Sequence, residues 1–221
     1  MTEWLTMNNV TKSYRSGGVL NGTRNTVLRD FSLSIREGER VGLHGPSGCG
    51  KSTVARLAAG LTSPDNGEIR VFGRNPSSQL SWVRNHQKSD LQILFQDPTI
   101  MLNPMHTLAQ NLSETQSIHN STVARESLIR QLRISHLLNR TPVAFSGGEW
   151  RRAALARVLL ANPKILIADE PTTGLDIDVK KDILDLLLDC TTGARALLLI
   201  SHDVMTLNYV TDRRVALQAC S

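Results

Sequence analysis

Hydrophobic and polar residues alternate along residues 27–35, a pattern that predicts a strand with one buried face. The side chains expected on that face are Val27, Phe31, Leu33 and Ile35. A short apolar stretch at residues 40–44 follows; it leads into a glycine-rich turn and then into a helical pattern at residues 51–59. Residues 17–26, rich in Gly, Asn and Thr, are predicted to be a loop. The first part of the chain is therefore expected to be rich in β-structure.

Two later stretches, residues 165–168 and 197–200, are uninterrupted apolar runs. Such runs are typical of parallel strands that are covered on both faces. Strands are predicted at residues 68–72, 91–95, 164–168 and 194–201, and the last two contain these apolar runs. Between about residues 107 and 138 the pattern changes to helical spacing, as at Leu128, Ile129 and Leu132, and no strand pattern interrupts it. The chain as a whole favours an α/β protein with a helical insertion.

Composition narrows the classes of function. The chain has 221 residues, 40% of them hydrophobic, and no apolar stretch approaches the roughly 20 residues that span a bilayer. Its first residues lack the basic head and apolar core of a secretory signal. Cys49, Cys190 and Cys220 are widely spaced, which favours reduced thiols over a disulfide framework or a zinc site. The net charge of +5 is mild and aromatic residues make up only 4%, so a cytosolic protein that binds no nucleic acid is expected.

Residues 45–52 match the phosphate-binding pattern G-x-x-x-x-G-K-[ST] and lie between a predicted strand and a predicted helix. In this pattern backbone N–H groups curl around phosphates, and the helix N-terminus adds a partial positive charge. Lys51 would reach the β- and γ-phosphates, and the Ser52 hydroxyl would hold Mg²⁺. A chance match in a chain of this length is on the order of one in a hundred. A glycine-rich loop without a ligand is therefore the minor alternative.

The acidic pair Asp169 and Glu170 directly follows the buried strand predicted at residues 164–168. A parallel strand delivers such residues to the carboxyl edge of the sheet, where α/β folds bind ligands. Asp169 would hold Mg²⁺ directly or through water, and Glu170 would polarise the water that attacks the γ-phosphate. Taken alone, the pair is explained equally well as a helix cap. Together with the phosphate-binding loop, it predicts nucleotide hydrolysis.

Residues 145–150, FSGGEW, contain no obvious nucleophile, metal ligand or general base, and Ser146 before a helix-favouring run predicts an N-cap. In combination with the two motifs above, the stretch resembles the signature sequence, most often LSGGQ, of the ATP-binding subunits of ATP-binding-cassette (ABC) transporters. The resemblance runs from about residue 10 to residue 215. It implies an α/β P-loop nucleotide-hydrolase core with a mixed or parallel sheet, an N-terminal antiparallel β subdomain and an inserted α-helical subdomain.

The resemblance also implies the domain organisation. Residues 1–221 are expected to form one ABC ATPase domain. Its catalytic core lies at about residues 1–98 and 144–221, and its helical subdomain lies at about residues 99–143.

Individual positions match the family's site residues. Tyr14 corresponds to the aromatic residue that stacks on adenine, and Gln96 to the glutamine that touches Mg²⁺ and the attacking water. His202 corresponds to the histidine that contacts the γ-phosphate, and Asp176 lies in the loop that crosses the dimer interface. Outside the family, Tyr14 would be read as packing, Gln96 as a polar strand end and Asp176 as a helix N-cap.

The full set of implied residues follows from these matches. The nucleotide-binding residues are Tyr14, Gly45, Pro46, Ser47, Gly48, Cys49, Gly50, Lys51, Ser52, Thr53, Ser146, Gly147, Gly148, Glu149 and Asp176. The catalytic residues are Lys51, Gln96, Glu170 and His202. The Mg²⁺ ligands are Ser52, Gln96 and Asp169.

Each active site in this family is shared, with the phosphate-binding loop of one subunit facing the signature of the other. Ser146 and the N–H groups of Gly147 and Gly148 would bind the γ-phosphate, so ATP would join two subunits and hydrolysis would release them. Glu149 replaces the usual Gln of the signature. We expect it to tune turnover and not to abolish it.

Residues 17–26 and 95–104 resemble the oligopeptide, dipeptide and nickel importers, in which two different ATPase subunits usually pair. A heterodimer is therefore expected, and a homodimer is left open. The chain ends at Ser221 without the C-terminal extension that peptide importers generally carry, which favours the nickel or metal-chelate branch. The expected partners are a second ABC ATPase subunit, membrane permease subunits and, indirectly, an extracytoplasmic binding protein. The chain is expected to be peripheral on the cytoplasmic face of the inner membrane.

Two other classes compete with the importer. Soluble ABC ATPases of DNA repair, translation or cofactor assembly usually show two cassettes, a long coiled coil or an inserted zinc site, and the sequence shows none of these. A P-loop kinase would not need the signature, the acidic pair and His202 in this order.

Overall fold

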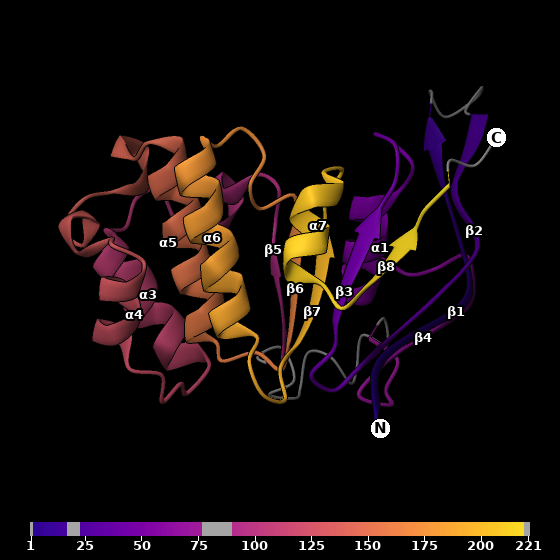
Figure 1. Cartoon of the computed structure of the whole chain (residues 1–221), viewed down its shortest axis with the longest axis horizontal. Helices are drawn as coiled ribbons and strands as arrows, with labels where there is room; N and C mark the ends of the chain where they lie inside the picture. Colours follow the sequence, from indigo (N-terminus) through magenta and orange to yellow (C-terminus); the bar gives the residue numbers. More distant parts are fainter. Residues whose placement is uncertain (1, 17–22, 77–89, 219–221) are drawn as a thin grey trace. The chain divides into compact units, whose positions relative to one another are not determined.

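The computed structural model describes residues 2–16, 23–76 and 90–218 (Figure 1). By its internal contacts the chain forms two compact units. The first unit consists of the residues up to 85 and from 196 onward, and the second of residues 86–195. The chain therefore leaves the first unit once and returns to it through its last strands.

The first unit contains a three-stranded antiparallel sheet in the order β2-β1-β4. Its strands are β1 (Glu3–Ser16), β2 (Thr23–Arg36) and β4 (Asn66–Val71). Phe31, Leu33 and Ile35 of β2 are buried, as the alternating pattern predicts. Burial of these large apolar side chains is the main force that fixes the register, since a slip of one residue would expose all of them.

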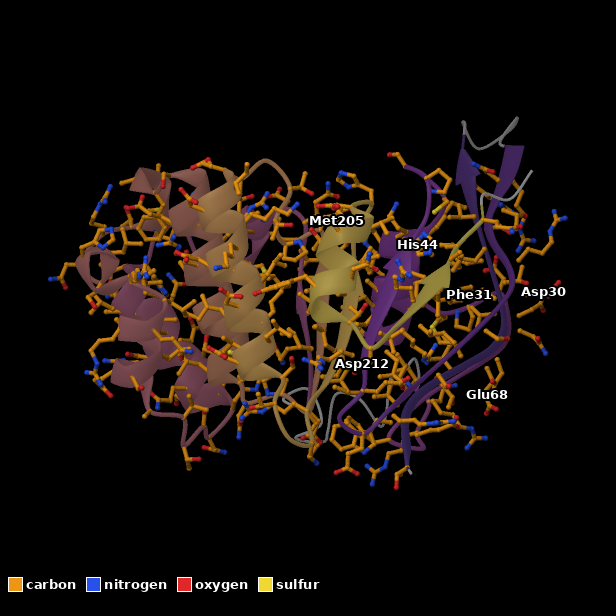
Figure 2. The ribbon with its side chains drawn as sticks, viewed as in Figure 1. Asp30, Phe31, His44, Glu68, Met205 and Asp212 are labelled. Carbon is orange, nitrogen blue, oxygen red and sulfur yellow. The ribbon has the colours of Figure 1, made fainter. Side chains whose placement is uncertain are left out.

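The buried face of β2 departs from the prediction at one position. Val27 is only half-buried, whereas the neighbouring Leu28 is 1% exposed. Between Phe31 and Leu28 the strand β2 advances three residues while its partner β1 advances two, which is a β-bulge. Asp30 lies inside this bulge with φ 48°, on the strand beside Phe31 (Figure 2). Because a bulge shifts the alternation by one residue, Leu28 and not Val27 joins the core.

The loop predicted at residues 17–26 is wrong for its last four residues. Residues 23–26 belong to β2 and pair in register with residues 13–16 of β1. The pairing satisfies the backbone N–H and C=O groups of both segments, and this outweighs a composition that favours a loop. Residues 17–22 lie outside the described residues.

The first unit also contains parallel strands in the order β7-β3-β8. These strands are β3 (Arg40–His44), β7 (Ala196–Ile200) and β8 (Arg213–Ala216), and the helices of this unit are α1 (Lys51–Ala58) and α7 (Val204–Val210). Every residue of β7 is buried, as its continuous apolar run predicts. Arg40 at the start of β3 forms an ion pair of 2.9 Å with Asp212. Asp212 directly precedes β8 (Figure 2).

The second unit contains a parallel strand pair and most of the helices. The strands are β5 (Leu91–Leu94) and β6 (Ile165–Asp169). The α-helices are α3 (Leu108–Ile118), α4 (Arg125–Gln131), α5 (Gly147–Leu160) and α6 (Ile177–Cys190), and the 3₁₀ helices are η2 (Pro98–Met101), η3 (Ser135–Leu137) and η4 (Pro142–Ala144). Residues 99–143, all of which the structure describes, form helices and connections but no strand.

This helical segment agrees with the spacing pattern of residues 107–138. The boundaries at residues 98 and 144 stay a prediction. Among the described residues, none of the helices combines enough length with enough hydrophobicity to cross a membrane.

Candidate functional site

The phosphate-binding loop, residues 45–52, joins β3 to α1 in the first unit and is folded back on itself. The Cys49 amide donates to the Pro46 carbonyl at 3.3 Å. The Lys51 ammonium donates to the carbonyls of Gly45 and Pro46, at 2.9 Å each, and its side chain is buried. The exposed tip of the loop consists of Pro46, Ser47 and Gly48. The loop therefore places one fixed positive charge directly behind its tip.

Two glycines of the loop are required by the surrounding atoms. A Cβ on Gly45 would stand 2.3 Å from the Leu217 carbonyl oxygen. Gly50 has φ 105°, and a Cβ there would stand 2.9 Å from the Val27 carbonyl oxygen. Gly50 is also the N-cap of α1 and offers no side-chain cap to the first turn, where Ser52 and Thr53 follow Lys51. A helix start of this kind presents N–H groups and a partial positive charge to an anion.

His202 lies at the same edge of the first unit as this loop. β7 runs parallel to β3 with Ile200 opposite Leu43, and the Ser201 amide donates to the Leu43 carbonyl at 3.1 Å. Gly45 follows the end of β3 and His202 follows Ser201 after the end of β7, so both lie beyond the carboxyl ends of neighbouring parallel strands. The predicted γ-phosphate histidine therefore lies at the same sheet edge as the phosphate-binding loop.

Tyr14 belongs to β1 and is 38% exposed. It pairs with Asn25 of β2. Val27 lies two residues further along β2, and its Cγ1 would be 2.8 Å from a Cβ added to Gly50. Two residues of a strand span about 7 Å. The predicted adenine-stacking residue therefore pairs with the same strand, β2, that packs against Gly50 of the phosphate-binding loop.

In the second unit, the acidic pair and Gln96 lie at one sheet edge. β5 and β6 are parallel with Leu94 opposite Ala168, so Gln96 follows the end of β5 just as Asp169 and Glu170 follow Ala168. Asp169 and Glu170 are buried, whereas Gln96 is exposed. The structure therefore brings these three predicted residues to the same edge.

Glu170 has an unusual backbone conformation. Its φ of 49° lies in the left-handed region, which costs a residue with a Cβ about 1–2 kcal/mol. Its Oε2 accepts a hydrogen bond from the Thr173 hydroxyl at 2.8 Å. Strained residues with fixed side chains are found disproportionately at functional sites, and Glu170 is such a residue at the predicted base position.

The signature, residues 146–149, forms the N-terminal turn of α5. Ser146 is the N-cap, and its hydroxyl accepts from the Glu149 amide at 3.4 Å while Glu149 Oε2 accepts from the Ser146 amide at 2.7 Å. Glu149 Oε1 also lies 2.9 Å from His136 Nε2 and 3.8 Å from Arg140. The hydrogen bond from the Ser146 amide is the largest cause that lowers the pKa of Glu149 to about 2, followed by the one from His136.

The two glycines of the signature are not required by packing. Among the described residues, no heavy atom lies within 4 Å of a Cβ built on Gly147, and for Gly148 the nearest is Val179 Cγ1 at 3.8 Å. Neither glycine has a positive φ. Packing among the described residues therefore does not explain why glycine stands at these two positions, and the open space fits the prediction that a phosphate approaches this helix start.

Asp176 occupies the N-cap position of α6, but its side chain makes no capping hydrogen bond. It is exposed, as are the neighbouring residues Gly174 and Ile177. A helix-capping role therefore explains why Asp176 lies at the start of α6, but it gives the carboxylate group no hydrogen bond to that helix.

The structure assembles the predicted site in two parts. Tyr14, residues 45–53 and His202 belong to the first unit, while Gln96, Asp169, Glu170, the signature and Asp176 belong to the second. The predicted Mg²⁺ ligands are divided between the parts, so their joint site stays a prediction. Within the described part of the chain, no three His, Cys, Asp or Glu side chains gather as a metal-binding group.

Sequence reasoning missed the residues that hold the predicted ones in place. Asp65 binds Lys12 beside Tyr14, and His136 binds Glu149. These pairs are separated by 53 and 13 residues, and no local pattern links their members.

The fold and these motifs define a P-loop nucleotide-hydrolase architecture. The profile of the family described as ABC transporter matches residues 28–173, and the chain belongs to this family. It is 32% identical over 197 residues to the oligopeptide transport ATP-binding protein OppF of Haemophilus influenzae, covering 85% of this chain and 59% of that protein. It is 34% identical over 220 residues to the di/tripeptide transport ATP-binding protein DppF of Pseudomonas aeruginosa, covering 94% and 68%.

Solved structures agree on the fold. The ATP-binding cassette MJ0796, solved as a dimer in a post-hydrolysis state bound to ADP and Pi, superposes with a TM-score of 0.84 at 27% identity and covers 98% of this chain and 97% of that one. The predicted fold class, an ABC ATPase core, is confirmed. The chain spans 59% and 68% of the length of the two transport proteins named above.

Proposed function

We propose that this chain is the ATP-hydrolysing subunit of an ABC importer for peptides or for metal chelates such as nickel complexes. The observation that carries the proposal is the loop of residues 45–52, where Lys51 is folded against the loop and α1 begins at a glycine without a side-chain cap. The N–H groups of such a helix start bind the phosphate chain of a nucleotide. The Lys51 ammonium then moves from the loop carbonyls to the β- and γ-phosphates of ATP.

Hydrolysis uses the carboxyl edges of the strands. Glu170 polarises the water that attacks the γ-phosphate, and its carboxylate is oriented by the Thr173 hydroxyl at 2.8 Å. Gln96 contacts the same water, and His202 donates a hydrogen bond to the γ-phosphate. Burial of Glu170 keeps bulk water away from the base.

Ser52, Gln96 and Asp169 would hold Mg²⁺. Their hydroxyl, amide and carboxylate oxygens are the hard donors that this ion prefers, and two or three protein ligands with water are typical for it. When bound, the ion neutralises charge on the β- and γ-phosphates of ATP.

The signature acts on a nucleotide held by a second subunit. The open space at Gly147 and Gly148 and the N–H groups after Ser146 suit a phosphate that arrives from outside the chain. Asp176, whose carboxylate caps no helix, lies in the loop that meets the partner. The dimeric form of the similar cassette MJ0796 supports this arrangement. The second subunit is expected to be a different ABC ATPase chain, with a second copy as the alternative.

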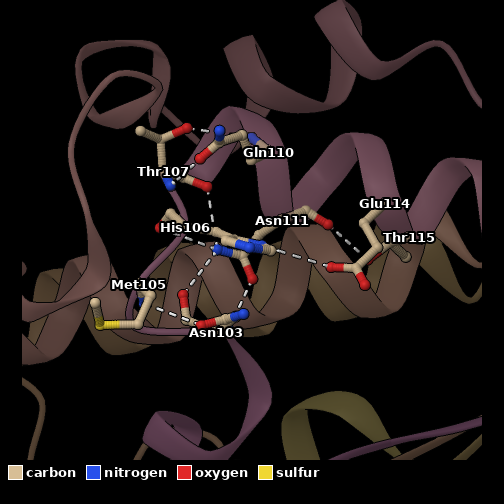
Figure 3. A network of polar contacts seen from close by, with 8 residues as sticks. All are labelled: Asn103, Met105, His106, Thr107, Gln110, Asn111, Glu114 and Thr115. Carbon is tan, nitrogen blue, oxygen red and sulfur yellow. Dashed lines mark hydrogen bonds and ion pairs between the residues drawn. The ribbon is translucent and has the colours of Figure 1, made fainter.

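The segment after Gln96 offers a surface for the membrane permease. Ile100 is 66% exposed and Met105 83% exposed, so two large apolar side chains of this segment face solvent. The loop that carries Met105 is fixed by Asn111, whose amide donates to the carbonyls of Asn103, at 3.1 Å, and of His106 and Thr107 (Figure 3). A fixed loop with exposed apolar tips suits docking of another protein chain. The chain would thereby sit on the cytoplasmic face of the inner membrane.

The cargo is selected by the permease and by an extracytoplasmic binding protein. The names of the transport proteins given above concern oligopeptides and di- or tripeptides, which favours a peptide as the cargo. The nickel or metal-chelate branch stays a prediction from the sequence.

The test is the variant Glu170→Gln, expressed together with any membrane subunits that neighbouring genes are found to encode. Gln keeps an oxygen that accepts from Thr173 but cannot act as a base. The variant should bind ATP with wild-type affinity, co-purify with the membrane subunits, and release phosphate at least about 100-fold more slowly than the wild type. Nucleotide binding and phosphate release are measured on the same preparation.

The control is Asp178→Asn, which changes an exposed carboxylate in the first turn of α6 and should leave both measurements unchanged. Hydrolysis by Glu170→Gln at the wild-type rate would remove Glu170 from the base position. Failure of the wild type to associate with any membrane subunit would contradict the importer assignment.

A further inference from the structure

The ring of Tyr14 has a cation over it. Lys12 and Tyr14 are two residues apart on β1 and therefore project to the same side of the strand. The Lys12 ammonium lies 5.6 Å from the centroid of the Tyr14 ring, within the range of a cation–π contact.

The Lys12 ammonium is held in place by groups outside β1. It donates to the Ser63 carbonyl at 2.7 Å and to Asp65 Oδ1 at 3.1 Å, and the lysine side chain is only 13% exposed. Lysines on a protein surface are ordinarily mobile and solvated, because ordering a long side chain costs entropy. This lysine is fixed against the ring.

Asp65 is itself an anchored carboxylate. It accepts from the Ser13 amide at 2.8 Å and from Arg24 at 2.8 Å. These hydrogen bonds, with Arg24 first and Ser13 second, hold the pKa of Asp65 well below its usual range. The carboxylate therefore stays ionised at every physiological pH and keeps its bond to Lys12.

We propose that Lys12, fixed by Asp65 and the Ser63 carbonyl, is a positioning residue for Tyr14 as the platform on which the adenine of ATP stacks. The inference rests on the proposed function and on the sequence prediction that Tyr14 receives the adenine base of ATP. Lys12 covers one face of the ring and restricts its rotation, so the other face is presented to the base in a single orientation. A platform that is ordered before binding loses less entropy when the base stacks.

The structure also offers a matched control at Arg24. Arg24 binds the same carboxylate as Lys12, but its side chain is 65% exposed. An exposed ion pair of this kind adds little to the free energy of folding because solvent and salt screen it, and the Ser13 amide still binds Asp65 when Arg24 is replaced. Arg24→Gln thus removes one partner of Asp65 and leaves Lys12 over the ring.

The experiment compares binding of Mg²⁺-ATP with binding of inorganic Mg²⁺-tripolyphosphate, which has no base. Lys12→Met removes the charge and keeps the apolar stem; it should weaken ATP binding about 3- to 10-fold and leave tripolyphosphate binding unchanged. Lys12→Arg keeps a cation over the ring and should restore most of the ATP affinity. Arg24→Gln should bind both ligands as the wild type does.

A double-mutant cycle separates positioning from a general structural effect. In a Tyr14→Ala background, Lys12→Met should cause no further loss of ATP affinity, since the ring it orders is gone. Equal weakening of ATP and tripolyphosphate, or the same loss with and without Tyr14, would overturn the inference while ATP binding by the wild type keeps the proposed function intact. A wild type that binds tripolyphosphate as tightly as ATP would also overturn the inference. A wild type that binds neither ligand would overturn the inference and the proposed function together.

Discussion

Glu149 replaces the glutamine expected in the signature, and its carboxylate is directed back into its own helix start. The Ser146 amide, and after it His136, hold the pKa of Glu149 at about 2, below the ordinary value of 4.5. The folded unit therefore binds fewer protons than the unfolded chain in this range. The ionised carboxylate stabilises the fold above about pH 4.5, and this contribution is lost as the pH falls toward 2.

The variant Glu149→Gln tests this assignment. Gln can accept the same hydrogen bond from Ser146 but carries no charge, so at pH 7 we expect the variant to be about 0.5–1 kcal/mol less stable. The gap in urea midpoint between wild type and variant should narrow as the pH is lowered from 5 to 3. His136→Ala removes the second donor to Glu149 and should reduce the same pH-dependent gap. A gap that stays constant over this pH range would mean that the carboxylate is not held ionised by its neighbours.

At the scale of elements, the turn between β3 and α1 depends on β2 behind it. Gly48 and Gly50 both have positive φ, but a Cβ on Gly48 meets no atom within 4 Å, whereas a Cβ on Gly50 collides with the side chain and carbonyl of Val27. Gly48→Ala should therefore cost about 1–2 kcal/mol from backbone strain alone. Gly50→Ala should cost at least about 1 kcal/mol more, because β2 or the loop must shift.

Thermal unfolding without nucleotide measures the two variants side by side. For a chain of this size, 1 kcal/mol lowers the midpoint by about 2–4 °C, so the two alanine variants should differ by at least that amount. Equal midpoints would show that β2 yields to the extra methyl group without cost.

Sequence patterns predicted most of these elements and few of the contacts between them. The continuous apolar runs of β6 and β7 predicted buried parallel strands, and Ser146 predicted the start of α5, because both signals are local. The bulge at Asp30 was not predicted, because it depends on how β2 pairs with β1. The contact of Lys12 with Asp65 could not be predicted from the sequence either, because the two residues are 53 positions apart and meet only in the folded chain.

At the scale of the whole molecule, the chain carries two helix starts suited to phosphate, and only one of them has a lysine. α1 begins beside Lys51, while α5 begins at the open glycines of the signature. In the proposed function each site uses α1 of one subunit and α5 of the other, so a pair of subunits that each carry both helix starts would hold two sites. Lys51→Ala disables the first half-site. Gly147→Asp should disable the second by repelling phosphate, without harming the fold, since the position is open and an acidic residue suits a first helical turn.

Mixing these two inactive variants tests the sharing of sites. If two copies pair, about half of the dimers in an equal mixture combine one chain of each kind, and each of those has one intact site of two. ATP hydrolysis should recover to about a quarter of the wild-type rate. If Lys51 and Glu170 of one chain act on the same ATP, Lys51→Ala mixed with Glu170→Gln should recover nothing, because every site then carries one of the two changes. With a different partner subunit, each single variant should instead retain about half of the activity and the double variant Lys51→Ala/Gly147→Asp none. Recovery in both mixtures, or full activity of the double variant, would contradict a site divided in this way.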